Sequence, residues 1–394
     1  MNKVLKGSIL IILCATLSLA FIFLSKKEYM KIEEGIGALK VEYRGIKGGN
    51  SFDFDEQGNV YIATNNSLET INKSGEVKKL FKEKGSEIYS LRYLNNKIYF
   101  LDRCYLKSFD LENKKIEILM DNIPNYGEYK EGKIIAEGKY IYISIGAVTN
   151  SAIAEKKYKE GMIYDLTPRE VTLNGENFGE EATGPFLPYG SSGKKGQVIN
   201  ANFPGNASVI KYDLNSKKGE LYCWGIKNIQ SFDVNSKGDI YSIVGGFENR
   251  GPRAIREDVD YIYKLEFDRW YGWPDYSGGE PINSELFTGV DGEKVEFILD
   301  NHPAQTVPKP MYEHNEVSSL KSLVIDKEKE LFKEEKIYFY DKNLGAINSL
   351  DFNGSTNLLT KFKSKDQIND LRVYDNKLYG FNQSKGIIFS LDLS

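Results

Sequence analysis

The sequence predicts an all-β protein, a six-bladed β-propeller closed by an N-terminal strand and preceded by an N-terminal membrane anchor. Three observations lead to this prediction. Two short sequence marks each recur six times in the same order, the residues between them alternate as in antiparallel hairpins, and a strand-like segment precedes the first repeat. The aromatic content of 13%, mostly Tyr and Phe, also favours β structure.

The first 27 residues have the pattern of a membrane anchor. Lysines flank an uncharged run over residues 7–25 on both sides. The run is near the lower limit of what spans a bilayer, and it is longer than most signal-peptide cores. We therefore expect residues 1–27 to be an uncleaved single-pass anchor that places the propeller outside the cytoplasm, at the cell membrane. The alternative is a cleaved signal peptide and a secreted protein.

A linker is expected over residues 28–37, and a single propeller domain over residues 38–394. Residues 39–43 alternate like a strand, and the chain stops just after the second mark of the sixth repeat. That ending leaves no room for the outer strand of the sixth blade. We predict that residues 39–43 supply this strand, which would join the two ends of the ring and remove an exposed sheet edge.

The repeats are defined by two marks. The first is an apolar residue followed by Tyr, as at Val60-Tyr61, Ile98-Tyr99, Ile141-Tyr142, Ile240-Tyr241, Ile337-Tyr338 and Leu378-Tyr379. The second is a hydrophobic residue followed by a polar one, as at Ile71-Asn72, Phe109-Asp110, Tyr212-Asp213, Leu265-Glu266, Leu350-Asp351 and Leu391-Asp392. Repeats of this length with four short strands are typical of propeller blades, which bury their faces by stacking around a ring. We place the first mark on the second strand of each blade and the second mark on the third.

Three expansions interrupt the regular repeats. Residues 143–210 separate the marks of repeat three, residues 242–264 separate those of repeat four, and residues 268–318 join repeats four and five. In a propeller, the loops from second to third strand and from blade to blade open on the same face. All three expansions are therefore expected to crowd one mouth of the central channel, where we expect a ligand site.

Composition excludes several kinds of function. The net charge of −4 gives no reason to expect nucleic acid as a partner. Cys104 and Cys223 cannot build a disulfide framework or a cysteine-based zinc site. His302 and His314 stand in different local contexts without metal-ligand spacing, so we expect surface or loop roles for them. No G-x-S-x-G motif of a serine hydrolase is present.

The chemistry of the expected mouth suits a small polar ligand. Residues 270–279 contain four aromatic residues, three glycines and a proline, which indicates a rigid loop. Trp270 and Trp273 are expected to be stacking surfaces, with Arg253 among several charged residues nearby. Such a mouth would take a carboxylated or hydroxylated small molecule, for example a saccharide.

Several segments resemble the soluble quinoprotein glucose and L-sorbosone dehydrogenases. The clearest is Tyr271-Gly272-Trp273-Pro274 with the following residues 275–279, and others lie at 149–151, 174–178, 183–186, 196–199, 224–228, 245–253 and 260–263. The resemblance runs from about residue 120 to 345. It implies a six-bladed propeller, a pyrroloquinoline quinone (PQQ) cofactor with calcium, and a histidine base that removes a sugar hydroxyl proton during hydride transfer.

Carried over residue by residue, the resemblance implies a modified site. Tyr129 stands at about the place of the family's histidine, and the neighbouring Glu128 is the other candidate base. Lys227 replaces the arginine of an Arg-Asn pair, whereas Asn228 is retained. The residues implied to hold the ligand or cofactor are Lys227, Asn228 and Lys342, and the backbone carbonyls implied to hold calcium lie near Gly246 and Phe247. The arginines that hold the quinone between blades five and six are absent from residues 365–370.

Three hypotheses follow from these observations. The first is a binding propeller at the cell surface whose redox chemistry is weakened or lost, and which binds a saccharide or another small polar ligand. The second is an active PQQ-dependent sugar oxidoreductase that uses Glu128 or Tyr129 as the base. The third is a protein-interaction platform, because a propeller fold does not by itself determine function.

Overall fold

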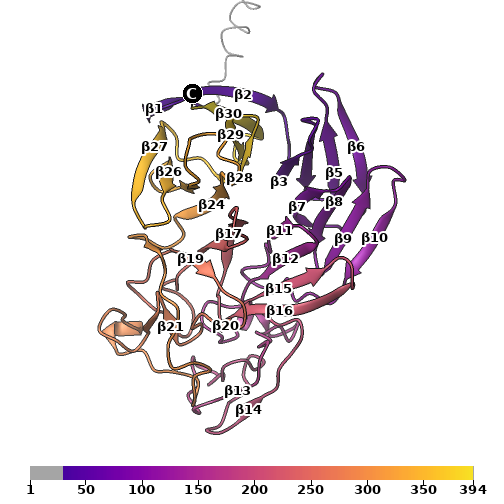
Figure 1. Cartoon of the computed structure of the whole chain (residues 1–394). Helices are drawn as coiled ribbons and strands as arrows, with labels where there is room; N and C mark the ends of the chain where they lie inside the picture. The colour runs from indigo at the N-terminus through magenta and orange to yellow at the C-terminus, as the bar shows by residue number, and fades with distance from the viewer. Residues whose placement is uncertain (1–29, 394) are drawn as a thin grey trace, which may run out of the picture.

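The computed structural model describes residues 30–393, and the anchor expected at residues 1–27 lies outside this range. Six antiparallel sheets are arranged as blades around a ring (Figure 1), as the repeats predicted. Apart from two short 3-10 turns, η1 (Lys156–Tyr158) and η2 (Val290–Gly292), the described residues contain no helix. Accordingly, no helix within residues 30–393 has the length and apolar character needed to cross a membrane.

The blades follow one another along the chain. Blade one contains β3 (Gly49–Phe54), β4 (Val60–Thr64), β5 (Ser67–Ile71) and β6 (Val77–Lys82). Blade two contains β7 (Ile88–Leu94), β8 (Lys97–Asp102), β9 (Tyr105–Asp110) and β10 (Ile116–Met120). Blade three contains β11 (Ile134–Glu137), β12 (Tyr140–Ile145), β15 (Ser208–Asp213) and β16 (Lys218–Trp224). Blade four contains β17 (Ile229–Val234), β18 (Ile240–Val244), β19 (Tyr261–Leu265) and β23 (Tyr312–Glu313). Blade five contains β24 (Leu320–Ile325), β25 (Ile337–Asp341), β26 (Ala346–Leu350) and β27 (Thr356–Phe362). Blade six contains β28 (Ile368–Tyr374), β29 (Lys377–Asn382) and β30 (Ile387–Asp392).

The first strands of the blades surround the axis of the ring. β3, β7, β11, β17, β24 and β28 contact one another in that order, and β28 contacts β3 to complete the circle. Hydrogen bonds between neighbouring first strands fix this arrangement. The Ser231 hydroxyl accepts a bond from the Leu323 backbone N–H at 3.0 Å, and the Ser51 hydroxyl donates to the Asp370 carboxylate at 2.7 Å across the closing junction.

The two sequence marks have a common structural explanation. In every blade, the apolar residue of the first mark lies directly opposite the hydrophobic residue of the second mark, as in the pair Val60 and Ile71 and the pair Leu378 and Leu391. These cross-strand pairs are buried. Direct cross-strand neighbours are the unit of side-chain packing in an antiparallel sheet. The apolar residues of the two marks are therefore core positions of each blade.

The ring is closed by the N-terminal segment, as expected. β2 (Ala38–Arg44) pairs antiparallel with β30 and becomes the outer strand of blade six. The segment expected to be a linker also contains a strand, β1 (Ile32–Gly35), which pairs with β27 as a fifth strand of blade five. Two blades are therefore tied together by consecutive strands, and the outer edges of both are covered.

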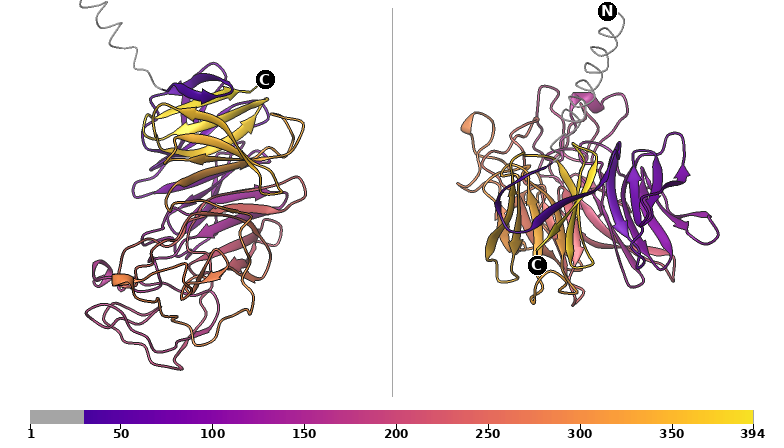
Figure 2. Two further views of the ribbon diagram at one scale, coloured as in Figure 1. Left: turned by 90° about the vertical axis from the view of Figure 1, so that its left-hand side faces the viewer. Right: turned by 90° about the horizontal axis from the view of Figure 1, so that it is seen from above.

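The three expansions pack together beside blades three and four. They contain the short strands β13 (Val171–Thr172), β14 (Val198–Ile199), β20 (Arg269–Trp270), β21 (Tyr276–Ser277) and β22 (Glu280–Pro281). In Figures 1 and 2 they form a lobe of loops next to these blades. The lobe has its own hydrophobic core, to which all three expansions contribute, including Phe186, Phe247 and Trp270.

The third expansion begins at a different place from the one predicted. Because β23 pairs with β19 as the outer strand of blade four, residues 266–311 connect the third and fourth strands of that blade rather than two blades. The connection starts on the opposite face of the ring. It then runs along the outer strand of blade three toward the expanded face, and there β20 pairs in parallel with β16. The two-residue strand β23 gave no periodic signal that sequence reasoning could detect.

Candidate functional site

The mouth of the channel on the expanded face carries a ring of bulged residues. In five of the six blades, the pairing of the first and second strands skips one residue near the start of the first strand. A β-bulge bends its strand and re-aims the extra side chain, and bulges are common next to functional sites. Four of the bulged residues are polar, namely Asn50, Gln230, Lys321 and Asn369, and the fifth is the buried Tyr89, whose hydroxyl bonds to Glu87.

Polar groups converge beside Gly245, which follows β18. A methyl group built on Gly245 would lie 3.7 Å from the Gln230 amide nitrogen and 3.8 Å from both the Asn228 amide nitrogen and an Asp260 carboxylate oxygen. Asp260 is held in place because it accepts bonds from the backbone N–H groups of Ser319 at 2.7 Å and Leu320 at 2.9 Å. The glycine thus leaves a space that is surrounded by hydrogen-bonding groups.

Two lysines from blade five add positive charge to this mouth. Among the described residues, the Lys321 and Lys342 side chains make no hydrogen bond or ion pair. Burial lowers the pKa of Lys321, and the groups that act on it electrostatically include Asp260, Lys342 and Glu248, which come from two blades. We call Asn228, Gln230, Asp260, Lys321 and Lys342 the polar mouth. Two cations without ion-pair partners give it the means to bind an anionic group.

Next to the polar mouth, the Tyr129 hydroxyl belongs to a closed network of charged groups. It donates a hydrogen bond to Glu248 at 2.9 Å and accepts one from Arg250 at 2.8 Å. Arg250 also bonds to Glu248 at 2.6 Å and forms an ion pair with Glu128 at 2.5 Å. Glu128 forms a second ion pair, with Lys157. Both sequence-predicted bases are therefore engaged with charged partners.

The electrostatics of this network favour a neutral phenol at Tyr129. Burial, together with the negative charge of Glu248, raises the pKa of Tyr129 far above its usual value. Burial would also raise the pKa of Glu248, but the bond from Arg250 and the charge of Lys227 outweigh it and hold the pKa of Glu248 below its usual range. A phenol with a raised pKa is a poor proton acceptor at neutral pH.

Asn150 and Lys227 connect this network to the loop after β18. Asn150 is buried, and its side chain bonds to the Glu248 backbone through both its oxygen, at 2.9 Å, and its nitrogen, at 2.7 Å. The Lys227 ammonium donates to the Asn150 side chain at 3.3 Å and to the Gly246 carbonyl. It also lies 4.8 Å from the centre of the Tyr129 ring. We call Tyr129, Asn150, Lys227, Glu248 and Arg250 the locked cluster.

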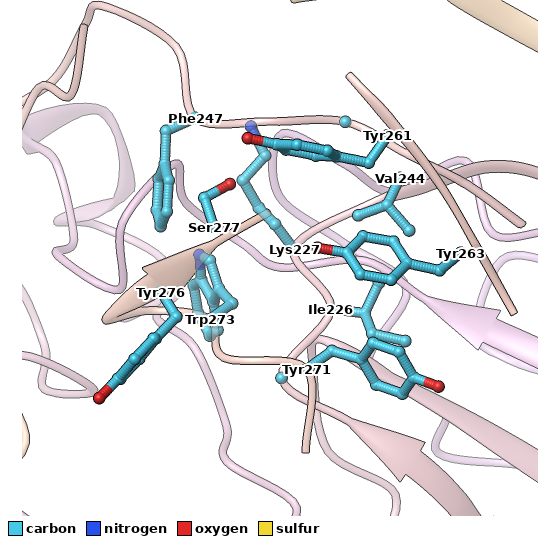
Figure 3. Close-up of a pocket in the computed structure, with 12 residues that line it drawn as sticks. Ile226, Lys227, Val244, Phe247, Tyr261, Tyr263, Tyr271, Trp273, Tyr276 and Ser277 are labelled. Atoms are coloured by element: carbon cyan, nitrogen blue, oxygen red, sulfur yellow. The ribbon is translucent and has the colours of Figure 1, made fainter. Parts of the chain in front are cut away.

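Trp270 and Trp273 do not provide the stacking surfaces that we predicted. They are 3% and 5% exposed and belong to the hydrophobic core of the lobe. Trp270 stacks on His302 and approaches Gly225 so closely that a Cβ there would lie 2.3 Å from its ring. Beside Trp273 lies a cavity of about 20 Å³, which has room for about one water molecule. Figure 3 shows residues that line it. Both tryptophans therefore fill the core of the lobe together with aliphatic side chains.

Arg253 is also absent from the mouth, contrary to our prediction. Its side chain is 2% exposed and forms an ion pair with the fully buried Asp275 at 2.8 Å. It donates further bonds to the carbonyl oxygens of Pro274 and Glu296, both within 2.9 Å. Asp275 in turn accepts bonds from the Leu299 backbone and from His302. Arg253 therefore holds the segments of the lobe together, because a buried arginine requires a carboxylate and several acceptors.

The histidines and cysteines carry no metal site among the described residues. His302 pairs with Asp275, and His314 pairs with Asp341 at 2.9 Å. Cys104 and Cys223 are free thiols. His314 lies in the loop before β24, close to the polar mouth, where its bond to Asp341 orients that carboxylate.

The structure therefore divides the predicted site residues into three groups. Tyr129, Glu128, Lys227, Gly246 and Phe247 lie together in or beside the locked cluster. Asn228 and Lys342 lie in the polar mouth. Trp270, Trp273 and Arg253 belong to the interior of the lobe. Sequence reasoning missed Asn150, Gln230 and Lys321. The bulges that present the last two follow from strand pairing, which single-sequence patterns do not reveal.

Sequence comparisons find no relative of this chain: no protein-family model matches it, and neither does any curated protein. Solved structures do match its fold. A calcium structure of Trichoderma reesei Carbohydrate-Active Enzymes Family AA12 has a TM-score of 0.62 at 13% identity, covering 93% of this chain and 97% of the other. The PQQ domain of pyranose dehydrogenase from Coprinopsis cinerea, in its holo form, also has a TM-score of 0.62, at 11% identity, with coverage of 92% and 96%. The PQQ-bound aldose sugar dehydrogenase from Streptomyces coelicolor has a TM-score of 0.54 at 9% identity, with coverage of 91% and 98%. The chain thus has the fold of PQQ-dependent sugar dehydrogenases, as its sequence resemblance implied.

Proposed function

We propose that this protein is a ligand-binding propeller that diverged from PQQ-dependent sugar dehydrogenases and lost their redox chemistry. The observation that carries the proposal is the locked cluster. The sequence resemblance puts Tyr129 at about the place of the family's histidine, and its hydroxyl is engaged by Glu248 and Arg250, with its pKa raised. A group in this state does not take a proton from a sugar hydroxyl during hydride transfer.

The ligand that fits best is a small hydroxylated molecule with a carboxylate, such as an acidic saccharide. The polar mouth offers the amides of Asn228 and Gln230 to hydroxyl groups, and the ammonium groups of Lys321 and Lys342 to a carboxylate. The names of the structural neighbours, pyranose dehydrogenase and aldose sugar dehydrogenase, support a sugar-like ligand.

Binding to the polar mouth can be tested by calorimetric titration of the purified protein with glucuronate, galacturonate and their neutral parent sugars. We expect an acidic sugar to bind more tightly than its neutral parent. A charge-assisted hydrogen bond contributes about 1.5–3 kcal/mol, so Lys321→Met should weaken binding roughly 10-fold to 150-fold. Lys237, which is exposed in the turn between β17 and β18, provides the control Lys237→Met. Equal affinity for acidic and neutral sugars, or full affinity in Lys321→Met, would refute this assignment.

An active PQQ-dependent sugar oxidoreductase is the second candidate, and the PQQ-bound neighbour favours it. The bound quinone would supply the hydride acceptor. Lys321 and Lys342 are suited to hold carboxylates of that quinone, but the implied calcium site fits poorly, because the Gly246 carbonyl already accepts a bond from the Lys227 ammonium. Glu128, the remaining candidate base, is only 9% exposed and lies between Arg250 and Lys157. These contacts favour the binding function.

We further propose that residues 1–27 anchor the protein in the cell membrane and that the propeller lies outside the cytoplasm. The proposal rests on the uncharged run at residues 7–25 with its flanking lysines. Cell fractionation combined with protease treatment of intact cells would test it. Release of the protein into the medium with a new N-terminus beyond residue 20 would instead support a cleaved signal peptide.

A further inference from the structure

The loop that joins blades three and four presents one lysine to a set of oxygen atoms. Lys227 lies between β16 and β17 and is 4% exposed. Backbone bonds fix this loop: the Ala147 N–H donates to the Lys227 carbonyl at 2.7 Å, and the Ile226 N–H donates to the Ala207 carbonyl at 3.1 Å. In Figure 3 the Lys227 side chain extends between the rings of Phe247 and Tyr261. The position of its ammonium group is therefore set by the fold.

The surroundings of this ammonium group resemble those of a bound metal cation. It donates to the Gly246 carbonyl and to the Asn150 side-chain oxygen. Burial lowers the pKa of this ammonium to about 8, and the negative charges of Glu248, Asp258 and Asp260 oppose that effect. Carbonyl and carboxylate oxygens are the ligands that Ca²⁺ prefers in proteins. Here a lysine stands among them.

A calcium ion would have to compete with this arrangement. It requires six to eight oxygen ligands, and a second cation beside the ammonium would be repelled. The carboxylates nearest to the loop are already in use. Asp258 accepts hydrogen bonds from the hydroxyls of Tyr261 and Ser277, and Asp260 accepts them from backbone N–H groups. Within residues 30–393, no cluster of three or more acidic, histidine or cysteine side chains could hold a metal ion, so a cation at this loop depends on the Gly246 carbonyl and the Asn150 side-chain oxygen, the two atoms that Lys227 contacts.

The local sequence suits a lysine that takes the place of a metal. Gly246 cannot be replaced without displacing its loop, because a Cβ there would lie 2.1 Å from the Val259 carbonyl oxygen and 2.8 Å from Asp258. The absence of a side chain allows the Gly246 carbonyl to face the ammonium. Lysine provides a compact point charge on a flexible stem, which fits one carbonyl better than the planar fork of arginine does.

We infer that the Lys227 ammonium supplies the positive charge at the Gly246 carbonyl that a metal ion would otherwise supply, so that the folded protein takes up no calcium at this site. The site thus contains a built-in cation. Its charge is present below the lowered pKa of about 8, so at neutral pH the shape of the loop does not depend on the calcium concentration around the protein. This inference concerns the loop after β18 and does not depend on which ligand the polar mouth binds.

The test is calcium binding by the purified full-length protein after treatment with a chelator. We expect no stoichiometric binding in calorimetric titration and no change in Tm with calcium up to about 10 mM, well above the ~10⁻⁴–10⁻³ M dissociation constants of extracellular calcium modules. Lys227→Ala removes the ammonium and leaves its oxygen partners, so this variant should gain a rise in Tm with calcium that is absent from the wild type. The control Lys237→Ala should behave like the wild type.

Two results would overturn the inference. One is binding of one calcium ion per wild-type chain that displaces Lys227 from the Gly246 carbonyl, detected as a calcium-dependent rise in Tm. The other is a folded Lys227→Ala variant whose Tm does not respond to calcium, which would show that the oxygen atoms do not form a cation site. If Lys227→Ala does not fold, Lys227→Met, which removes the charge and keeps the apolar stem, takes its place in the same titration. Sugar binding is measured separately, so failure of the proposed function would be distinguishable.

Discussion

Replacing Tyr129 with Phe removes one hydroxyl from the locked cluster and leaves the ring in place. The hydroxyl donates to Glu248 at 2.9 Å and accepts from Arg250 at 2.8 Å. Both partners are charged, and both retain their bond to each other at 2.6 Å. The substitution therefore tests whether the hydroxyl stabilises the fold of this loop, as our account requires.

The expected loss can be worked out from these contacts. Hydrogen bonds to charged groups contribute about 1.5–3 kcal/mol each, so two such bonds set an upper limit of about 6 kcal/mol. Glu248 and Arg250 side chains are 27% and 35% exposed, so water can replace part of what each loses. We therefore expect Tyr129→Phe to lower the free energy of unfolding by about 2–3 kcal/mol.

Equilibrium urea denaturation followed by tryptophan fluorescence measures this difference, because the indoles of Trp270 and Trp273 lie in the adjacent lobe core. Tyr105→Phe is the matched control. Tyr105 is 39% exposed and makes no hydrogen bond through its hydroxyl among the described residues, so we expect a change within about 0.5 kcal/mol. A loss below about 0.5 kcal/mol in Tyr129→Phe would refute our reasoning, because the bonds of the hydroxyl would then contribute nothing measurable to the stability of this loop.

Three further predictions follow from the buried groups. Arg253→Met leaves the buried Asp275 with His302 as its remaining ion-pair partner and should lower the free energy of unfolding by about 3–5 kcal/mol in urea denaturation. An unchanged midpoint would contradict the role of the Arg253–Asp275 ion pair. Trp270→Ala should cost about 3–5 kcal/mol but leave the sugar affinity of the folded protein unchanged, and a selective loss of affinity would instead restore the predicted stacking role. Although burial lowers the pKa of His314, its bond to Asp341 outweighs this and raises the pKa above 6.5. The stabilisation by this pair is therefore complete below pH 6.5, and it is lost as the pH rises through the raised pKa of His314. The difference in the free energy of unfolding between wild type and His314→Asn should shrink over that pH range. A difference that does not depend on pH would contradict this assignment.

The regular part of the fold could be predicted from the sequence because each blade repeats the same cross-strand pair. Val60 with Ile71 is one example, and every other blade contains its equivalent. The closing strand β2 was predictable for a related reason, since an incomplete sixth blade needs an outer strand. Local pattern and ring architecture point to the same answer in these elements.

The lobe could not be predicted in the same way. Trp270 lies in the two-residue strand β20 and Arg253 lies in a loop. Irregular segments rich in aromatic and basic side chains are as typical of a binding surface as of a small core. Tertiary packing decided between these roles, because Arg253 pairs with the buried Asp275 and Trp270 packs into the hydrophobic core of the lobe. Lys321 is a site residue that the sequence analysis missed. It lies on a regular strand whose sequence pattern does not mark it as a binding residue, and the β-bulge turns its side chain toward the mouth.

The central claim, that redox chemistry has been lost, is tested most directly by reconstitution with PQQ. The full-length protein is incubated with PQQ and calcium and supplied with aldoses, and reduction of an electron-accepting dye is measured beside a PQQ-dependent glucose dehydrogenase as positive control. Our account predicts no aldose-dependent dye reduction above the protein-free rate. Aldose-dependent reduction that is lost in Glu128→Gln or Tyr129→Phe would contradict it.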